Sequence, residues 1–250
     1  MFCTVFCTLL TIPTCVPAAI ENLGVLNLRR SKVHGTISDT FVDNCGLTTL
    51  DLNGNQLEGK LPASLVNYKM LEILDIGNNQ IYDSFPCSLH IISRLRVLVL
   101  RSNKFYGTIG CAGTNSTWPV LQIIDLAGNN FTGNLPHEKF LTWKAMMANA
   151  LLKLNHLQFE SEQYRQLYYQ NAITVTGKGR EMQLVKILTI FTSIDFSCNN
   201  FHGSIPKEIG KLPSAIYSTC HIMLLQAKYH RLLETCNFLS RCKSFKFSHS

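Results

Sequence analysis

The chain has 250 residues and a net charge of +7, with 23 Lys and Arg residues against 16 Asp and Glu residues. Much of this basic excess lies after Pro213, so the remainder is only mildly basic and we expect no nucleic-acid site. The ten cysteines form no C-x-x-C pair, and no histidine is spaced to complete a zinc set, so we expect no metal centre and no cofactor.

Residues 1–22 allow two interpretations. Met1–Ile12 is apolar and Pro17-Ala18-Ala19 would suit a signal-peptide cleavage site, but no positive residue follows the initiator. Ile12-Pro13 instead matches the I-P pair that closes the repeats described next, about 25 residues before Ile37. We favour this second interpretation, in which the chain begins inside a longer array of repeats.

From residue 23 to residue 136 one pattern returns five times, with the form L-x-x-L-x-L-x-x-N-x-L-x-G-x-L-P. Its clearest copies are LTTLDLNGNQLEGKLP, Leu47–Pro62, and LQIIDLAGNNFTGNLP, Leu121–Pro136. The repeated asparagines follow one another at intervals of 24, 24 and 26 residues. A period of this length with these residues is typical of leucine-rich repeats, each of which buries its apolar side only by stacking on a neighbour.

Within each repeat, the alternate leucines of L-x-L should point into the core from a short strand, leaving the residues between them on the concave surface. The predicted fold is therefore an α/β leucine-rich-repeat solenoid, a curved right-handed coil with short parallel strands on its concave face. The asparagine amide can both donate and accept, so we expect buried copies to bond to the neighbouring coil as an asparagine ladder. Its members would be Asn55, Asn79, Asn103, Asn129 and Asn199.

The residues between the inward pairs form a candidate concave ligand face. Its members are Arg29, Asp51, Asp75, Arg101, Asp125 and Asp195. The aspartates would suit a basic partner, although L-D-L is also a common form of this repeat. Arg29 and Arg101 are less routine and are our first choice for direct ligand contacts. We expect nothing to shield the aspartates or to separate their pKa values, so they do not indicate acid–base catalysis.

Cys87 and Cys111 occupy equivalent places on adjacent coils. Stacked strands lie about 4.8 Å apart, which is within the Cα separation of a disulfide, so a Cys87–Cys111 bridge is possible. Two reduced, buried thiols are the alternative.

Two glycosylation sequons begin at Asn115 and Asn130 and suit a secreted surface.

The interval from Asn129 to Asn199 is 70 residues, which leaves about 46 residues beyond one period. We assign residues 137–190 to an island insertion, followed by a sixth repeat at residues 191–212. The segment HEKFLTWKAMM could form a short helix, and ITVTGKGREMQLVKIL predicts a hairpin around Gly177-Lys178-Gly179. The candidate contact residues of the island are Tyr164, Tyr168, Tyr169 and Lys178. A spacer without a ligand is the alternative.

Residues 213–250 do not continue the repeat pattern. Their longest apolar run, Ile222–Leu225, is far shorter than the ~20 residues of a membrane span. We interpret this basic tail as sequence foreign to the repeat fold, and we expect it to be poorly ordered.

The repeat ending L-x-G-x-I-P resembles the plant extracellular leucine-rich-repeat subfamily. F-L-T-W-K-A-M-M, followed by Y-Y-x-x-A-I-T-V-T-G-K-G-x-E, resembles the island region of plant receptor-like proteins. These are cell-surface immune receptors with a leucine-rich-repeat ectodomain, one membrane span and no kinase domain. The resemblance covers about residues 12–212 and implies further repeats and a span, so we expect this chain to be truncated at both ends.

The same resemblance implies a function in plant defence or development signalling. The concave face and island would recognise an extracellular peptide, protein or glycan elicitor, and signalling would pass through a partner receptor kinase and a co-receptor. The parent family is located at the plasma membrane with its repeats outside the cell.

An enzyme is not expected, because the chain has no G-x-S-x-G, no H-E-x-x-H and no phosphate loop. The alternative function is a secreted leucine-rich-repeat inhibitor of cell-wall-degrading enzymes, similar to the polygalacturonase-inhibiting proteins. Those proteins lack an island, so residues 137–190 count against this alternative.

Overall fold

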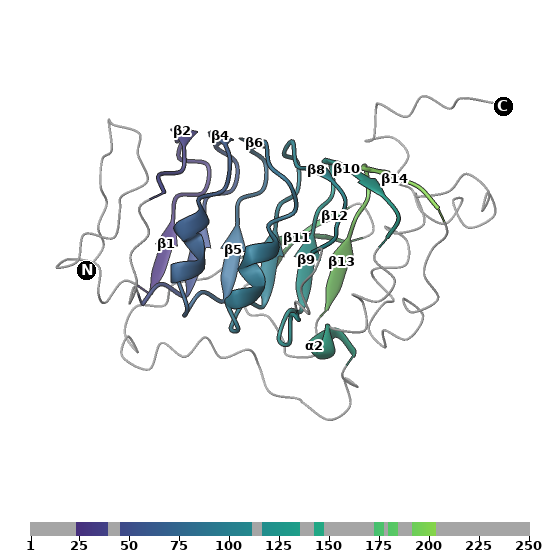
Figure 1. Cartoon of the computed structure of the whole chain (residues 1–250). Coiled ribbons are helices and arrows are strands. Elements are labelled where there is room, and N and C mark those ends of the chain that lie inside the picture. Colours follow the sequence, from purple (N-terminus) through teal and green to yellow (C-terminus); the bar gives the residue numbers. More distant parts are fainter. Residues whose placement is uncertain are drawn as a thin grey trace.

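The computed structural model describes residues 24–39, 46–111, 117–135, 143–147, 173–177, 180–184 and 192–203. These residues form a solenoid of stacked coils, and its longest sheet confirms the predicted parallel strands (Figure 1). The sheet has six strands in the order β1-β3-β5-β7-β9-β13. The strands are β1 Val25–Asn27, β3 Thr49–Asp51, β5 Ile73–Asp75, β7 Val97–Val99, β9 Ile123–Asp125 and β13 Ser193–Asp195.

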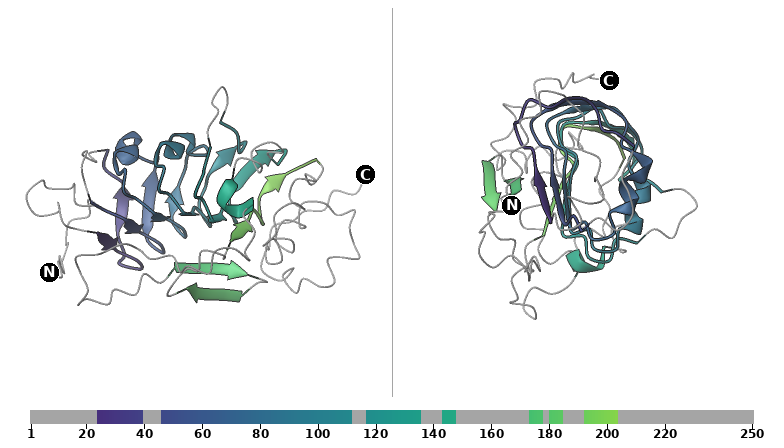
Figure 2. Two further views of the ribbon diagram at one scale, coloured as in Figure 1. Left: turned by 90° about the horizontal axis from the view of Figure 1, so that it is seen from below. Right: turned by 90° about the vertical axis from the view of Figure 1, so that its left-hand side faces the viewer.

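The second half of each repeat forms two shorter parallel sheets. One contains β2 (His34–Thr36), β4 (Gln56–Gly59) and β6 (Gln80–Ile81), and the other contains β8 (Tyr106–Gly107), β10 (Asn130–Gly133) and β14 (Asn200–Phe201). Two 3₁₀ helices, η1 (Ala63–Asn67) and η2 (Cys87–Ile91), follow prolines and lie on the side of the coil opposite the six-stranded sheet (Figure 2). Proline suits the residue before such a helix because its fixed φ begins the turn.

The core lies between the six-stranded sheet and the outer side of the coils. The first inward residue of each of the five later strands is at most 2% exposed; these residues are Leu50, Leu74, Leu98, Ile124 and Ile194. The phenylalanines of the second half-repeat continue this packing, since the ring centroids of Phe105 and Phe131 lie 6.0 Å apart and those of Phe131 and Phe201 lie 6.3 Å apart. One apolar interior therefore runs through all the coils. This is expected, because a single repeat cannot bury its own apolar side.

The five ladder asparagines are buried and bond to the preceding coil. Asn103 illustrates the arrangement: its Oδ1 accepts the N–H of Ile81 at 3.0 Å. Its Nδ2 donates to the carbonyl oxygens of Ile76 and Leu100, each at 3.0 Å. One amide thus satisfies backbone groups of two coils, groups that would otherwise be buried without partners.

Asp83 stands where the other repeats have glycine. Gly59 and Gly107 have φ values of +79° and +77°, a conformation that favours glycine, whereas Asp83 is not among the described residues with positive φ. The Asp83 carboxylate instead accepts the N–H of Leu61 on the preceding coil at 3.0 Å and that of Ser84 at 2.8 Å. The local departure in sequence is therefore matched by a different turn.

The sixth coil stacks directly on the fifth, although about 70 residues separate them in sequence. Strand β13 pairs with β9 in parallel, with Ile194 opposite Ile124. The Oδ1 atom of Asn199 accepts the N–H of Phe131 at 3.0 Å across a sequence separation of 68 residues. The insertion therefore leaves the stack without interrupting it.

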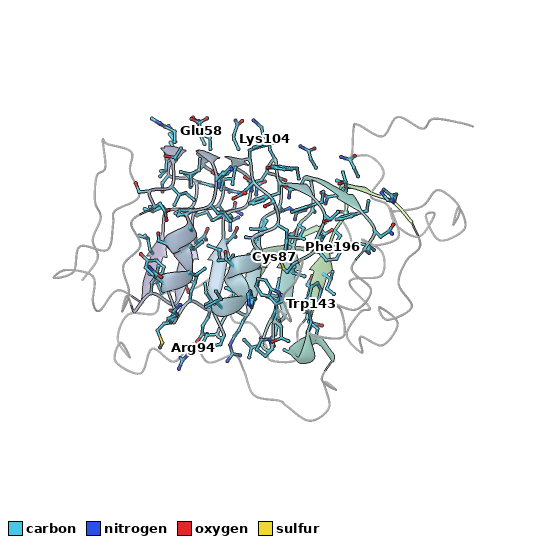
Figure 3. All side chains as sticks on the ribbon, viewed as in Figure 1. Glu58, Cys87, Arg94, Lys104, Trp143 and Phe196 are labelled. Atoms are coloured by element: carbon cyan, nitrogen blue, oxygen red, sulfur yellow. A yellow bond between two sulfur atoms is a disulfide. The ribbon has the colours of Figure 1, made fainter. Side chains whose placement is uncertain are left out.

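Two described parts of the insertion match the predicted helix and hairpin. Helix α2 spans Lys144–Met147, and strands β11 (Ile173–Gly177) and β12 (Arg180–Leu184) form an antiparallel hairpin. Trp143, beside α2, is buried and meets the ring of Phe196 edge-on at 6.4 Å (Figure 3). Trp143 therefore packs in the solenoid core, although it lies inside the predicted insertion.

None of the helices in the described ranges is both long and apolar enough to cross a membrane.

Candidate functional site

The concave face of the six-stranded sheet carries two parallel rows of side chains. One row runs Thr49, Ile73, Val97, Ile123 and Ser193, because each of these residues is paired in register with the next. The other row runs Asp51, Asp75, Val99, Asp125 and Asp195. Strand alternation places both rows on the face opposite the leucine core.

The aspartates of the second row close the turns that follow their strands. Asp75 Oδ1 accepts the N–H of Gly77 at 3.0 Å, and Asp125 and Asp195 make the equivalent bond two residues ahead. Asn27 does the same at the first strand, where it accepts the N–H of Arg29 at 2.9 Å. A short side chain that bonds to backbone two residues on is a standard turn device, which explains why L-D-L recurs without reference to a ligand.

Side chains also link neighbouring coils along the second row. Asn53 donates through Nδ2 to Asp75 Oδ1 at 2.9 Å and accepts from Asn78 at 3.2 Å. Gly77 leaves room for this contact, since a Cβ at that position would lie 2.8 Å from Asn53 Nδ2 and 3.2 Å from Arg101 Cγ. The sequence alone does not single out Asn53 or Gly77, because their roles depend on which residues of the adjacent coil lie beside them.

Arg101 lies between two carboxylates of the second row. Its Nη1 is 3.1 Å from Asp125 Oδ2 and its Nη2 is 3.8 Å from Asp195 Oδ2. The Arg101 side chain is 16% exposed, so most of its surface faces protein. Our first choice for direct ligand contact is thus engaged in an internal ion-pair cluster that joins three coils.

Burial changes the acidity of these carboxyl groups. Loss of solvent raises the pKa of Asp75 to about 7, with a further contribution from the charge of Asp51. Loss of solvent also raises the pKa of Asp125 to about 7, even though Arg101 beside it acts in the opposite direction. The expectation that nothing shields these aspartates is therefore wrong: all four are at most 4% exposed.

The island hairpin lies on the same side of the sheet as these rows. Figure 2 shows β11 and β12 beside the six-stranded sheet, on the side away from the two 3₁₀ helices, in both of its views. Figure 1 shows the hairpin behind β9, between β5 and β13. The described hairpin of the island and the concave rows thus lie on the same side of the solenoid.

The remaining predicted residues lie at the first-strand end of the sheet, elsewhere on the solenoid or outside the described part. Arg29 is half-buried at the first strand, and Asn130 is exposed on β10. Cys87 and Cys111 form a disulfide with a Cα–Cα distance of 5.5 Å. Asn115, Tyr164, Tyr168, Tyr169 and Lys178 lie outside the described residues.

Two features of the region were missed in the sequence. Cys198 is disulfide-bonded, but its place in the sixth repeat gave no spacing signal. The apolar residues of the concave rows are as fully buried as the core, although their positions predict exposure. In the part of the chain that the structure describes, no group of His, Cys, Asp and Glu residues could hold a metal ion.

Family comparison identifies the repeats. The family described as "Leucine rich repeat" matches residues 21–81, and a second leucine-rich-repeat family matches residues 120–138 and 191–212. These segments include five of the six strands of the concave sheet, and β7 lies between the first two matched segments.

Two similar proteins come from Arabidopsis thaliana. Receptor-like protein 18 is 48% identical over 95 residues, which cover 38% of this chain and 11% of that protein. Receptor-like protein 35 is 46% identical over 97 residues, which cover 39% of this chain and 10% of that protein. The chain spans about a tenth of the length of the curated relatives it matches.

Among solved structures, the crystal structure of PEPR1–AtPEP1 superposes with a TM-score of 0.53 and 24% sequence identity. The match covers 76% of this chain and 20% of that chain. This likeness supports the solenoid fold.

Proposed function

Because this chain belongs to the plant leucine-rich-repeat receptor-like proteins, we propose that it is part of a receptor ectodomain that recognises an extracellular elicitor. The observation that carries the proposal is the position of the island. It leaves the stack between β9 and β13 and places its hairpin beside the concave sheet. A long insertion that returns to one face of a rigid scaffold is more typical of a recognition element than of a connector.

The ligand class is a peptide, protein or glycan, bound without chemistry. The concave sheet supplies a preorganised wall, since its strands are fixed by the ladder and by the Arg101 ion-pair cluster. Arg29 lies in the turn after the first strand of this wall and is half-buried, and its guanidinium suits an anionic or hydrogen-bonding group of the ligand.

Signalling would follow from association with other chains rather than from catalysis. We propose a receptor kinase and a co-receptor as partners, and a role in defence or development. The Cys87–Cys111 disulfide and the exposed sequon at Asn130 support a location outside the cell, where disulfides persist and sequons are glycosylated.

Binding measurements on the purified, secreted chain test this proposal. Peptide and glycan pools prepared from a fungal culture filtrate would be passed over the immobilised protein, and the bound mass would be recorded by interferometry. We expect saturable binding of one pool that falls at least about tenfold in the Arg29→Glu variant.

Arg94→Glu is the matched control, because Arg94 is exposed at the lower edge of the solenoid and precedes strand β7 instead of lying in the concave rows (Figure 3). This variant should bind normally. Equal loss in both variants, or no saturable binding of either pool, would contradict the proposal. Inhibition of a fungal pectin-degrading enzyme by the purified chain would favour the cell-wall-enzyme inhibitor instead.

A further inference from the structure

Four apolar residues lie together at the centre of the concave face. Ile73, Val97 and Ile123 are consecutive members of the first row, and Val99 is beside them between Asp75 and Asp125. We call Ile73, Val97, Val99 and Ile123 the concave apolar patch. It spans the three adjacent inner strands β5, β7 and β9 and is flanked by the polar residues Thr49 and Ser193.

The concave apolar patch is buried but does not belong to the solenoid core. All four side chains are 0% exposed. None of them joins the core cluster, which contains their inward-facing neighbours Leu74, Leu98 and Ile124. Side chains on the outer face of a sheet lose their solvent only when another segment covers that face.

The β11–β12 hairpin has the composition to cover this patch. Its register pairs Ile173 with Leu184 and Val175 with Met182, so these four apolar residues share one face of the hairpin. The intervening pairs are Thr174 with Gln183 and Thr176 with Glu181, so the other face is polar. A two-stranded hairpin with one apolar face is only marginally stable in water unless that face is packed.

The position of the hairpin and the charge of one of its residues also suit packing on the concave apolar patch. The hairpin lies on the concave side of the sheet, and Figure 1 shows it behind β9, between β5 and β13 (Figures 1 and 2). Arg180 pairs with Gly177 and falls on the apolar face of the hairpin, at its turn end. A cation on that face suits the aspartates of the second row, which lies next to the patch.

We propose that the β11–β12 hairpin docks on the concave apolar patch through the face of Ile173, Val175, Met182 and Leu184. The surface that it presents to a ligand is then the opposite face, with Thr174, Thr176, Glu181 and Gln183. Two hydroxyls, an amide and a carboxylate select a hydrogen-bonding ligand over an apolar one. This assignment of the ligand surface rests on the proposed function, whereas the docking itself does not.

Hydrogen–deuterium exchange of the secreted chain, measured without ligand, tests the docking. The variants Val175→Lys and Met182→Lys place a charge on the docking face. We expect each to raise the exchange rate of amides in residues 173–184 at least about tenfold, while the ladder-bonded amides of Ile81 and Phe105 keep their protection.

Thr174→Lys and Thr176→Lys are the matched controls on the opposite face and should leave exchange in the hairpin unchanged. From the sheet side, Val97→Lys should deprotect the hairpin, whereas Ile91→Lys, at an exposed position, should not. If Val97→Lys also deprotects the amides of Ile81 and Phe105, it has disturbed the solenoid itself. The variants in the hairpin then decide whether the hairpin is docked.

Hairpin amides that exchange at free-chain rates in the unmodified protein would overturn the docking, as would equal effects of lysine on the two faces. Because no ligand is present, this result is independent of the binding experiment. If the hairpin is docked but no elicitor binds, the docking stands and the proposed function is rejected. If an elicitor binds but the hairpin is not docked, only the docking is rejected.

Discussion

Each ladder asparagine carries backbone hydrogen bonds that no other residue type of its size could make together. Asn129 accepts from the N–H of Phe105 and donates to the carbonyl oxygens of Leu100 and Leu126, all at 3.0 Å. Serine replaces asparagine at residue 31. Its side chain is shorter and has one donor hydrogen, whereas the asparagine amide has two. The ladder is therefore a set of buried polar contacts whose loss leaves main-chain groups without partners.

We predict that Asn129→Ala lowers the free energy of unfolding by about 3 kcal/mol, because several buried backbone groups lose their partners. Chemical denaturation followed by circular dichroism measures this change. Asn130→Ala is the control at the adjacent, exposed position and should change stability by less than about 0.5 kcal/mol. Equal losses in the two variants would show that Asn129 is not a ladder member.

The raised carboxyl pKa values predict a dependence of stability on pH. Asp75 and Asp125 titrate near 7 in the folded chain and near 3.8 when unfolded, so the folded state binds more protons between these values. Their contribution is fully present below about pH 4 and is lost as pH rises through about 7, with a slope of at most about 1.4 kcal/mol per pH unit for each group.

Urea unfolding at pH 5 and pH 8 should therefore show greater stability at pH 5. Asp75→Asn, which imitates the protonated side chain, should reduce this difference. A stability that rises from pH 5 to pH 8, or an unchanged difference in Asp75→Asn, would mean that the Asp75 side chain is not buried as described.

At the scale of elements, the 3₁₀ helix η2 and the coil that follows it are joined covalently. Cys87 is the first residue of η2, and Cys111 is its equivalent on the next coil, 24 residues later. The bond closes one complete coil of the solenoid and so restricts the unfolded chain.

Replacing both cysteines, in Cys87→Ala with Cys111→Ala, should lower the free energy of unfolding by about 3 kcal/mol for a closed loop of this length. Unfolding would be measured by circular dichroism without reductant, because Cys198 is also disulfide-bonded and a reductant would act on it too. No difference between the double variant and the unmodified chain would show that the two thiols are not bonded.

The sequence was sufficient to predict the elements that repeat. Leu74, Ile76 and Asn79 each keep a fixed place within the period, so strand, core and ladder positions follow from alignment of the repeats. The hairpin was also predictable, because alternating residues flank Gly177-Lys178-Gly179.

The surroundings of the concave residues were not predictable in the same way. Strand alternation puts Val97 and Asp75 on the outer face, and a repeat seen alone leaves them in solvent. Their burial depends on where a segment far away in sequence returns, and Arg101 depends likewise on carboxylates from two other coils. No local pattern carries information about such contacts. The sequence therefore predicted solvent-exposed residues available to a ligand, whereas the structure has these residues buried and bonded to other parts of the chain.

At the scale of the whole molecule, the sixth coil stacks on the fifth even though the island separates them in sequence. Coils five and six meet as closely as any other pair: Leu126 donates to the carbonyl of Asp195 at 2.8 Å, and Gly128 donates to that of Ser197 at 2.9 Å. This continuity lets the concave sheet extend to six strands.

Amide exchange at Phe131 tests this continuity most directly, because its N–H donates to Asn199 across 68 residues of sequence. In the unmodified chain we predict strong protection of the Phe131 amide, and in Asn199→Ala a loss of that protection while the Phe105 amide, bonded to Asn129, stays protected. A Phe131 amide whose exchange is the same in both proteins would contradict the account, since the sixth coil would then not be stacked on the fifth.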